Sequence, residues 1–363
     1  MFTKNDTWLM KGFAIIFLYC YHCFSDVSRL SGVDVNFFPF EKEMGMYICE
    51  SLNMCVGMFA FLSVYGMTLV IKKNNHGMKM TIKDKVNFVL GRYIGLIGGF
   101  FIPFVFCQIV SIFFDYNPYG QGAVNQIGNR MIDMFGLSMF FKTTMLTTTW
   151  WYVSLAVLFI VVFPLVLNLY EKYSVIIVPM IGLILLLFVK DVDNMNRWLF
   201  VLPLGICFAD LEIFEKMYIW MRKSKKTKWV KRLILYVLFL AFVYIRPHPW
   251  GLQHLKLIIN SVIPVFMIGI LYDIFHNKEH MKKGFVFLGK HSGDMFYVHT
   301  FIRSIWLNKL TYSFQSAILI LLFLLIVTLA ISIVFDFIRM KFRWKEKIMY
   351  VKQKSAALVE IHL

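Results

Sequence analysis

Charged residues are scarce in this sequence, and no long polar region interrupts it. Only 16% of its 363 residues are Asp, Glu, Lys or Arg, 59% are hydrophobic, and the mean hydropathy is +0.66. No polar stretch is long enough to bury a core of its own, which excludes a separate soluble domain. Apolar runs of about 20 residues recur along the chain, and they predict an all-α fold, a polytopic bundle of membrane helices.

Acidic residues are few as well, since 21 Asp and Glu stand against 38 Lys and Arg, for a net charge of +17. We predict ten spans, at residues 8–27, 45–70, 88–114, 150–169, 174–190, 197–215, 233–247, 254–276, 291–307 and 316–338. With a cytoplasmic N-terminus, the inner segments contain 26 of the 38 Lys and Arg residues. Positive charge follows the cytoplasmic side, so both termini are expected there. The basic run from Arg222 to Lys228 is then a topology signal that attracts anionic membrane lipid rather than nucleic acid.

Cysteines and processing signals are also sparse. Six cysteines occur, all within apolar spans, so no disulfide is expected. Cys20 and Cys23 form a C-x-x-C pattern, but on a helix His22 points about 200° away from Cys20. Three such side chains cannot converge on one metal ion, and no metal is expected. The first apolar run has no small-residue cleavage site after it, which predicts a retained helix.

Two ionisable residues, Lys11 and His22, lie inside the first predicted span. Such residues are costly in hydrocarbon and mark candidate functional sites. Eleven helical steps place His22 about 16 Å further along the helix and within about 20° of Lys11 around its axis. Asp26 follows at i+4 and can either orient the imidazole or end the helix. The competing interpretations are a packing histidine and a lysine whose amine reaches the membrane interface.

Further cations flank the predicted cytoplasmic side of the neighbouring spans. Arg92 opens the third span, and Lys72 and Lys73 end the second. Together with Lys11 they can form a basic mouth for a polyphosphate. The positive-inside bias alone also explains the two adjacent lysines.

The ninth span is unusually polar. Its ionisable and hydroxyl residues include His291, Ser292, Asp294, His299 and Arg303. So polar a helix must face protein or a cavity, and we expect either a substrate-binding wall with His299 and Arg303 or a structural hydrogen-bond network. Ser63 in the second span and Trp151 at the outer start of the fourth are further substrate-binding candidates. Trp at that position is also typical of a membrane interface.

Five segments in this order resemble motifs of the acyltransferase 3 family of integral membrane acyltransferases: Lys11 to His22, Phe59 to Gly66, Phe88 to Leu96, Trp150 to Ser154 and Leu288 to His299. They are similar to the family's arginine and histidine with ten residues between them, and to its F-x-F-L-S-G-Y, R-x-x-R-L, W-[FY]-[LI] and L-G-x-x-S…Y-x-x-H patterns. There are two departures. Lys11 replaces an arginine and loses its bidentate fork, and Val64 replaces a glycine, which puts close helix approach there in question.

The resemblance implies a plasma-membrane O-acetyltransferase that moves an acetyl group from cytoplasmic acetyl-CoA to a hydroxyl of a capsular or other surface polysaccharide. His22, assisted by Asp26, is then the general base, because histidine suits proton transfer near neutral pH. The residues assigned to the CoA phosphates are Lys11, Arg92, Lys72 and Lys73. The residues assigned to the acceptor are Ser63, Trp151, His299 and Arg303.

Two other classes of function stay open at this point. A glycan exporter also suits ten spans with polar residues at mid-depth, but the sequence shows no internal repeat. A non-catalytic component of a polysaccharide-synthesis complex is the second. We expect as partners a glycan or lipid-linked glycan, membrane lipid, and a second copy of the chain or the polysaccharide-synthesis machinery. Residues 1–340 are assigned to the transmembrane domain and 341–363 to a basic cytoplasmic tail.

Overall fold

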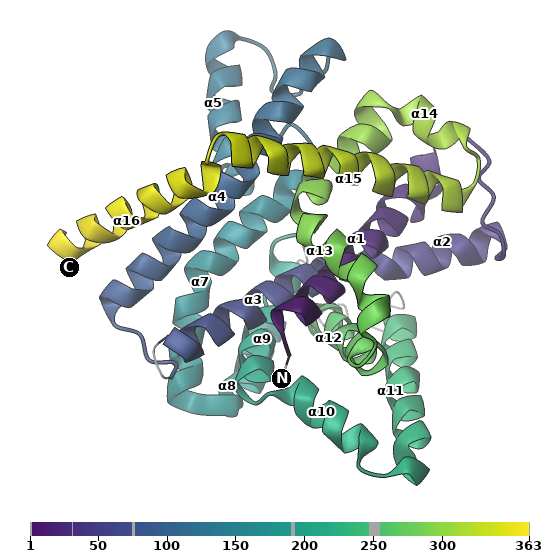
Figure 1. The fold of residues 1–363 in the computed structure, drawn as a ribbon, viewed down its shortest axis with the longest axis vertical. Helices are drawn as coiled ribbons and strands as arrows, with labels where there is room; N and C mark the ends of the chain where they lie inside the picture. The colour runs from purple at the N-terminus through teal and green to yellow at the C-terminus, as the bar shows by residue number, and fades with distance from the viewer. Residues whose placement is uncertain (1, 31, 75–76, 190–192, 247–254, 363) are drawn as a thin grey trace. The chain divides into compact units, whose positions relative to one another are not determined.

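The structure is a computed structural model that describes residues 2–30, 32–74, 77–189, 193–246 and 255–362 (Figure 1). Throughout these ranges the regular elements are helices, without a strand, so the all-α prediction is confirmed. The α-helices are α1 (Lys4–Phe24), α2 (Lys42–Ser51), α3 (Cys55–Asn74), α4 (Ile82–Phe113), α5 (Ala123–Met134), α6 (Ser138–Phe141), α7 (Trp151–Tyr173), α8 (Ile177–Phe188), α9 (Val201–Asp210), α10 (Ile213–Arg222), α11 (Lys225–Ile245), α12 (Leu255–Phe275), α13 (Glu279–Thr300), α14 (Asn308–Ser313), α15 (Ala317–Lys341) and α16 (Trp344–His362).

Within the described residues, six helical stretches are long and apolar enough to cross a membrane, judged by length and composition. These stretches are Lys4–Phe24, Lys42–Asn74, Ile82–Phe113, Thr148–Phe188, Leu255–Phe275 and Ala317–Lys341. The chain is therefore a multi-pass membrane protein. The count of ten spans and the cytoplasmic placement of both termini stay predictions.

Left-handed residues divide two of the apolar regions. Ser174, with φ +54°, separates α7 from α8, where the fourth and fifth predicted spans adjoin. Glu212, with φ +52°, separates α9 from α10. The predicted span 197–215 is therefore not one continuous helix, because α9 has ten residues and a length of about 15 Å, half of a hydrocarbon core.

The helices group into two compact units. The first unit comprises Met1–Leu18, Ser51–Lys79 and Phe163–Lys290, and the second comprises Tyr19–Glu50, Met80–Val162 and His291–Leu363. Helices α1, α7 and α13 contribute residues to both units, and so does α2 through its last residue, Ser51.

In the first unit, glycines allow α1 and α13 to touch backbone to backbone. A Cβ atom on Gly12 would lie 2.1 Å from the carbonyl oxygen of Phe285. A Cβ atom on Gly289 would lie 1.8 Å from the carbonyl oxygen of Trp8. Since a carbon atom cannot approach a carbonyl oxygen that closely without a covalent bond, only glycine fits at either position.

A third glycine in the first unit explains how Val64 is accommodated. Val64 on α3 is fully buried, and its Cβ lies 2.8 Å from where a Cβ on Gly205 of α9 would stand. The two helices thus approach closely although α3 carries a valine, because the glycine that close packing needs lies on the partner helix.

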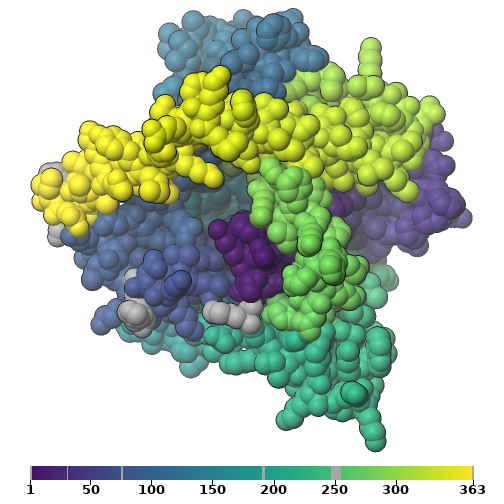
Figure 2. Space-filling view, viewed as in Figure 1, coloured from purple at the N-terminus to yellow at the C-terminus, as the bar shows by residue number. Residues whose placement is uncertain are grey.

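In the second unit, the segment assigned to a basic tail forms α16, which packs along α4. The Trp344 indole stacks on Phe101 with ring centroids 5.3 Å apart, and its Nε1 donates to the carbonyl oxygen of Gly98 at 2.8 Å. The space-filling view shows α16, in yellow at the C-terminal end, lying over the blue segment of α4 (Figure 2). At the start of α4, Thr81 and Asp84 form a capping box that satisfies free N–H groups of the first turn.

Candidate active site

Two histidines predicted from separate spans are neighbours in the second unit. His22 lies in the last turn of α1 and His299 in the last turn of α13. Their ring centroids are 5.0 Å apart and their planes are inclined by 49°. The structure therefore brings together the two imidazoles that the sequence places far apart in the chain.

The His299 ring is fixed by hydrogen bonds on both nitrogens. Its Nδ1 donates to the carbonyl oxygen of Phe296 at 2.6 Å, since a carbonyl can only accept. In the neutral ring Nε2 is then an acceptor, and the Thr300 hydroxyl donates to it at 3.1 Å. Thr149 extends this series of hydrogen bonds, with its hydroxyl oxygen 3.0 Å from that of Thr300. Tyr19 stacks on the fully buried ring with centroids 5.4 Å apart, which holds its plane as well.

His22 is held less tightly than His299. Its ring is half-buried, and its Nδ1 lies 3.5 Å from Nη1 of Arg29, a distance at the outer limit of a hydrogen bond. The Arg29 guanidinium also donates to the Tyr21 carbonyl at 3.1 Å and lies over the Tyr21 ring. The imidazole of His22 is thus the more adaptable of the two and stands beside a permanent positive charge.

Arg29 is not among the site residues predicted from the sequence. The residue follows the end of α1, in a short 3-10 turn from Val27 to Leu30 that brings its side chain back toward His22. Helical periodicity carries no information beyond the end of a helix. The available signal was its charge, because cations are rare in the segments predicted to face outward.

Arg303 lies four residues after His299, in a π-helical turn from Phe301 to Trp306. Its Nε is buried without a hydrogen-bond partner among the described residues, and so is the hydroxyl of Ser304. Leaving a buried donor unpaired costs about 1–3 kcal/mol. Because π-helical turns occur frequently at functional sites, these two groups are candidates for contact with a bound substrate.

The structure does not pair Asp26 with His22. The helix ends at Phe24, so the i+4 geometry assumed for Asp26 does not exist. The carboxylate is exposed and accepts the backbone N–H of Ser28 at 2.8 Å, and this hydrogen bond lowers the pKa of Asp26 below its ordinary value. The residue orders the turn after the helix, which was the alternative interpretation.

The four cations assigned to the CoA phosphates are divided between the two units. Arg92 lies on α4 in the second unit, with its guanidinium over the Phe88 ring, and the three lysines belong to the first unit. Lys72 forms an ion pair with Asp210 at 3.1 Å and also donates to its carbonyl oxygen. Lys73 is exposed and Lys11 is half-buried. Lys72 is thus occupied by a structural contact.

The remaining substrate-binding candidates differ in their surroundings. Ser63 is exposed on α3, and its hydroxyl donates to the Phe59 carbonyl of its own helix at 2.8 Å. Trp151 is half-buried, whereas the preceding Trp150 is fully buried and donates from Nε1 to the carbonyl oxygen of Tyr297 at 3.1 Å. The indole that anchors α13 is therefore that of Trp150, one residue before the predicted Trp151.

The polar residues of the ninth span divide into two groups. Asp294 accepts a bidentate ion pair from Arg339 of α15 at 2.6 and 2.7 Å. His291 lies 2.9 Å from the Ser332 hydroxyl of the same helix. These residues form the structural network that was one of the two expectations. His299 lies apart from that network and packs against His22, and its role in substrate binding stays a prediction.

The cysteines are free thiols, with Cys23 buried and Cys20 half-buried. In the described part of the chain, no group of three or more His, Cys, Asp or Glu side chains is arranged to hold a metal ion.

Comparison with known proteins gives one match. A family model described as an acyltransferase domain, Acyl_transf_3, matches residues 8–337. No curated protein and no solved structure matches the chain. The match includes both histidines, Arg29 and Arg303, and confirms the resemblance drawn from the five sequence segments.

Proposed function

The chain belongs to the acyltransferase 3 family, and on this basis we propose that it transfers an acetyl group from cytoplasmic acetyl-CoA to a hydroxyl of a cell-surface or capsular polysaccharide, in the plasma membrane. The observation that carries the proposal is the packing of His22 against His299, with centroids 5.0 Å apart, at the ends of two helices of the family domain. A sugar hydroxyl has a high pKa and needs a base to attack a thioester. An imidazole supplies that base near neutral pH.

In the proposed step, His22 takes the proton of the acceptor hydroxyl as its oxygen bonds to the thioester carbonyl carbon. The tetrahedral intermediate then collapses, and the bond from carbon to sulfur breaks. The CoA thiolate takes the proton back from the imidazolium, so the products are an acetyl ester and free CoA. No net proton or electron remains on the protein.

His299 serves as a positioning residue in this scheme. Both of its nitrogens are engaged, by Phe296 and Thr300, which leaves neither available to accept a proton from substrate without loss of a hydrogen bond. The half-buried and loosely held His22 is the better base. Arg29 and Arg303 are proposed to stabilise the oxyanion of the intermediate, since charge-assisted hydrogen bonds in a site that excludes water contribute strongly to catalysis.

The CoA phosphates are proposed to contact Lys11 and Arg92, with Lys73 as a further candidate. Lys72 is the weakest of the original four because Asp210 already neutralises it. The acceptor is proposed to be a glycan or a lipid-linked glycan. It is proposed to reach His22 at the C-terminal end of α1, the end opposite to Lys4.

The test is proton NMR of surface glycan from cells that carry the wild-type protein, a deletion or His22→Ala. Loss of the O-acetyl signal in both altered strains, at normal membrane abundance of the variant, supports the proposal. An unchanged O-acetyl signal in the deletion strain contradicts it. Glycan that no longer reaches the surface, with its acetyl content unchanged, identifies an exporter instead.

A further inference from the structure

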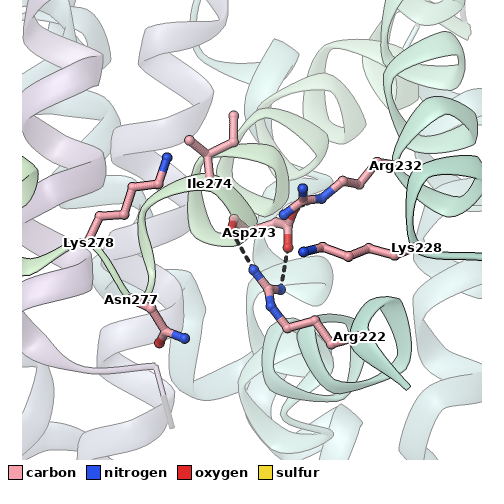
Figure 3. A pocket seen from close by; sticks show the side chains of 7 residues that line it. All are labelled: Arg222, Lys228, Arg232, Asp273, Ile274, Asn277 and Lys278. Carbon is pink, nitrogen blue, oxygen red and sulfur yellow. Dashed lines mark hydrogen bonds and ion pairs between the residues drawn. The ribbon is translucent and has the colours of Figure 1, made fainter. Parts of the chain in front are cut away.

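A basic pocket in the first unit includes neither histidine of the candidate site and has no role in the proposed reaction. It is a cavity of about 260 Å³ at the junction of α10, α11, α12 and the turn before α13 (Figure 3). The polar residues that line it are Arg222, Lys228, Arg232, Asp273, Asn277 and Lys278. They come from two stretches of sequence, residues 222–232 and 273–278, that lie about 40 residues apart in the chain.

One buried carboxylate organises the two arginines of this pocket. Asp273 is 1% exposed at its side chain and accepts hydrogen bonds from Nη1 of Arg222 and, at 2.6 Å, from Nε of Arg232. Arg222 also donates from Nη2 to the Asp273 carbonyl oxygen at 3.1 Å. Because a buried carboxylate is costly without partners, this triad fixes both guanidinium groups in place.

The remaining positive charge of the pocket is not neutralised. In Figure 3 the side chain of Lys228 points toward Asp273, and Lys278 lies on the opposite side. Over the described ranges of the chain, neither lysine has a carboxylate oxygen within 4.0 Å of its Nζ. Four cations and one carboxylate line the cavity, and the excess charge and the fixed donors suit a multivalent oxyanion.

We propose that this pocket binds the phosphate group of a phosphate ester. Fixed guanidinium forks and mobile ammonium groups together match the several oxygens of a phosphate. The ester can come from an anionic phospholipid or from a soluble molecule. The lipid source is supported by the exposed Trp220 and Trp229 on the adjoining helices, 52% and 71% exposed, since Trp is enriched at membrane interfaces.

The alternative interpretation is that these cations only reflect the excess of positive charge on the cytoplasmic side of a membrane protein. Two matched double variants distinguish this alternative from a specific phosphate site. Lys228→Gln with Lys278→Gln removes two charges from the pocket and leaves the Asp273 triad intact. Lys225→Gln with Lys226→Gln removes two charges from exposed positions at the start of α11, outside the pocket lining. If only the overall surface charge matters, both double variants weaken phosphate binding equally.

The experiment is a titration of the purified full chain in detergent, followed by native mass spectrometry. One arm adds phosphatidylglycerol, with phosphatidylcholine as the neutral lipid, and the other adds adenosine 3′,5′-bisphosphate. We expect the pocket pair to weaken binding at least about tenfold in one arm, as loss of a charge-assisted contact does, and the outer pair to weaken it less than about twofold. The arm that responds identifies the source of the phosphate.

Equal weakening by both pairs, or no binding of either ester to the wild-type chain, overturns the proposal. Unfolding temperatures of both variant pairs show whether the pocket pair is still folded. If it is not, the single variants Lys228→Gln and Lys278→Gln are titrated in its place. Binding is measured without acyl transfer, so this proposal and the proposed function fail independently.

Discussion

The helices α1 and α13 contact each other in two different ways. In the first unit the contact is between backbones, through Gly12 and Gly289. In the second unit, about three helical turns further along both helices, the contact is between the side chains of His22 and His299. The first contact sets how close the helices are and includes no ionisable group, whereas the second joins two ionisable rings. Variants at the two contacts should therefore separate stability from activity.

His22→Ala is expected to have the largest effect, a loss of acetyl transfer of about 100- to 10,000-fold, because a general base contributes that much. The measurement is transfer from radiolabelled acetyl-CoA to glycan by protein in nanodiscs. His291→Gln is the matched control, since His291 belongs to the structural network with α15. The role of His22 is wrong if its variant transfers at the wild-type rate.

Gly289→Ala is expected to break the backbone contact. Its Cβ would stand 1.8 Å from the Trp8 carbonyl oxygen, and neither backbone can yield locally. We expect a destabilisation of about 3 kcal/mol or more, measured as thermal unfolding in detergent.

Gly293→Ala is the control for that variant. Among the described residues, a Cβ at Gly293, on the same helix, meets no atom within 4 Å apart from those of its own helix turn. The change should leave the unfolding temperature unchanged or raise it, since alanine favours helix over glycine. Equal losses at the two positions would show that helix propensity, not the crossing, decides the result.

Gly205→Ala tests whether a contact between a glycine and a side chain behaves more mildly than one between backbones. The new methyl group would meet Val64 Cβ at about 2.8 Å. We expect a cost of about 1–3 kcal/mol. Val64→Ala in the same chain should recover most of it, as a coupling energy in a double-mutant cycle. Additive losses would contradict the contact.

Thr149→Val is expected to have the smallest effect. It removes the hydroxyl that contacts Thr300 and thereby weakens the series of hydrogen bonds that holds the His299 ring. Loss of one hydrogen bond of about 1 kcal/mol should lower kcat about fivefold with KM unchanged. Thr149→Ser keeps the hydroxyl and should restore the rate. A serine variant as slow as the valine variant would show that packing, not the hydrogen bond, is responsible.

Much of the site could be predicted residue by residue from the sequence. His22 and His299 stand out because imidazoles are rare in apolar spans. Their proximity could not be predicted, since a helical period relates residues only within one helix. The same limit explains the error at Asp26, where the period was extended past the last helical residue, and the omission of Arg29, which a turn brings back to the helix end.

The effect of two residues on α3 depends on the helix that packs against them, which the local sequence does not reveal. Val64 departs from the family pattern, but Gly205 supplies the space that a glycine on α3 would have supplied. Lys72 has the charge that a phosphate contact needs, but Asp210 forms an ion pair with it. In both cases the decisive residue lies on α9, far along the chain.

The sequence by itself determined that this protein is helical, crosses a membrane several times and belongs to an acyltransferase family. Hydropathy, charge and short motifs are local properties, and the cost of exposing backbone in lipid leaves few other folds. Only the tertiary structure decided which polar residues meet. His299 and Asp294 both lie on α13, but His299 packs against His22 whereas Asp294 pairs with Arg339. The reason is that side chains one and a half turns apart point to different neighbours, and only packing determines which neighbours are there.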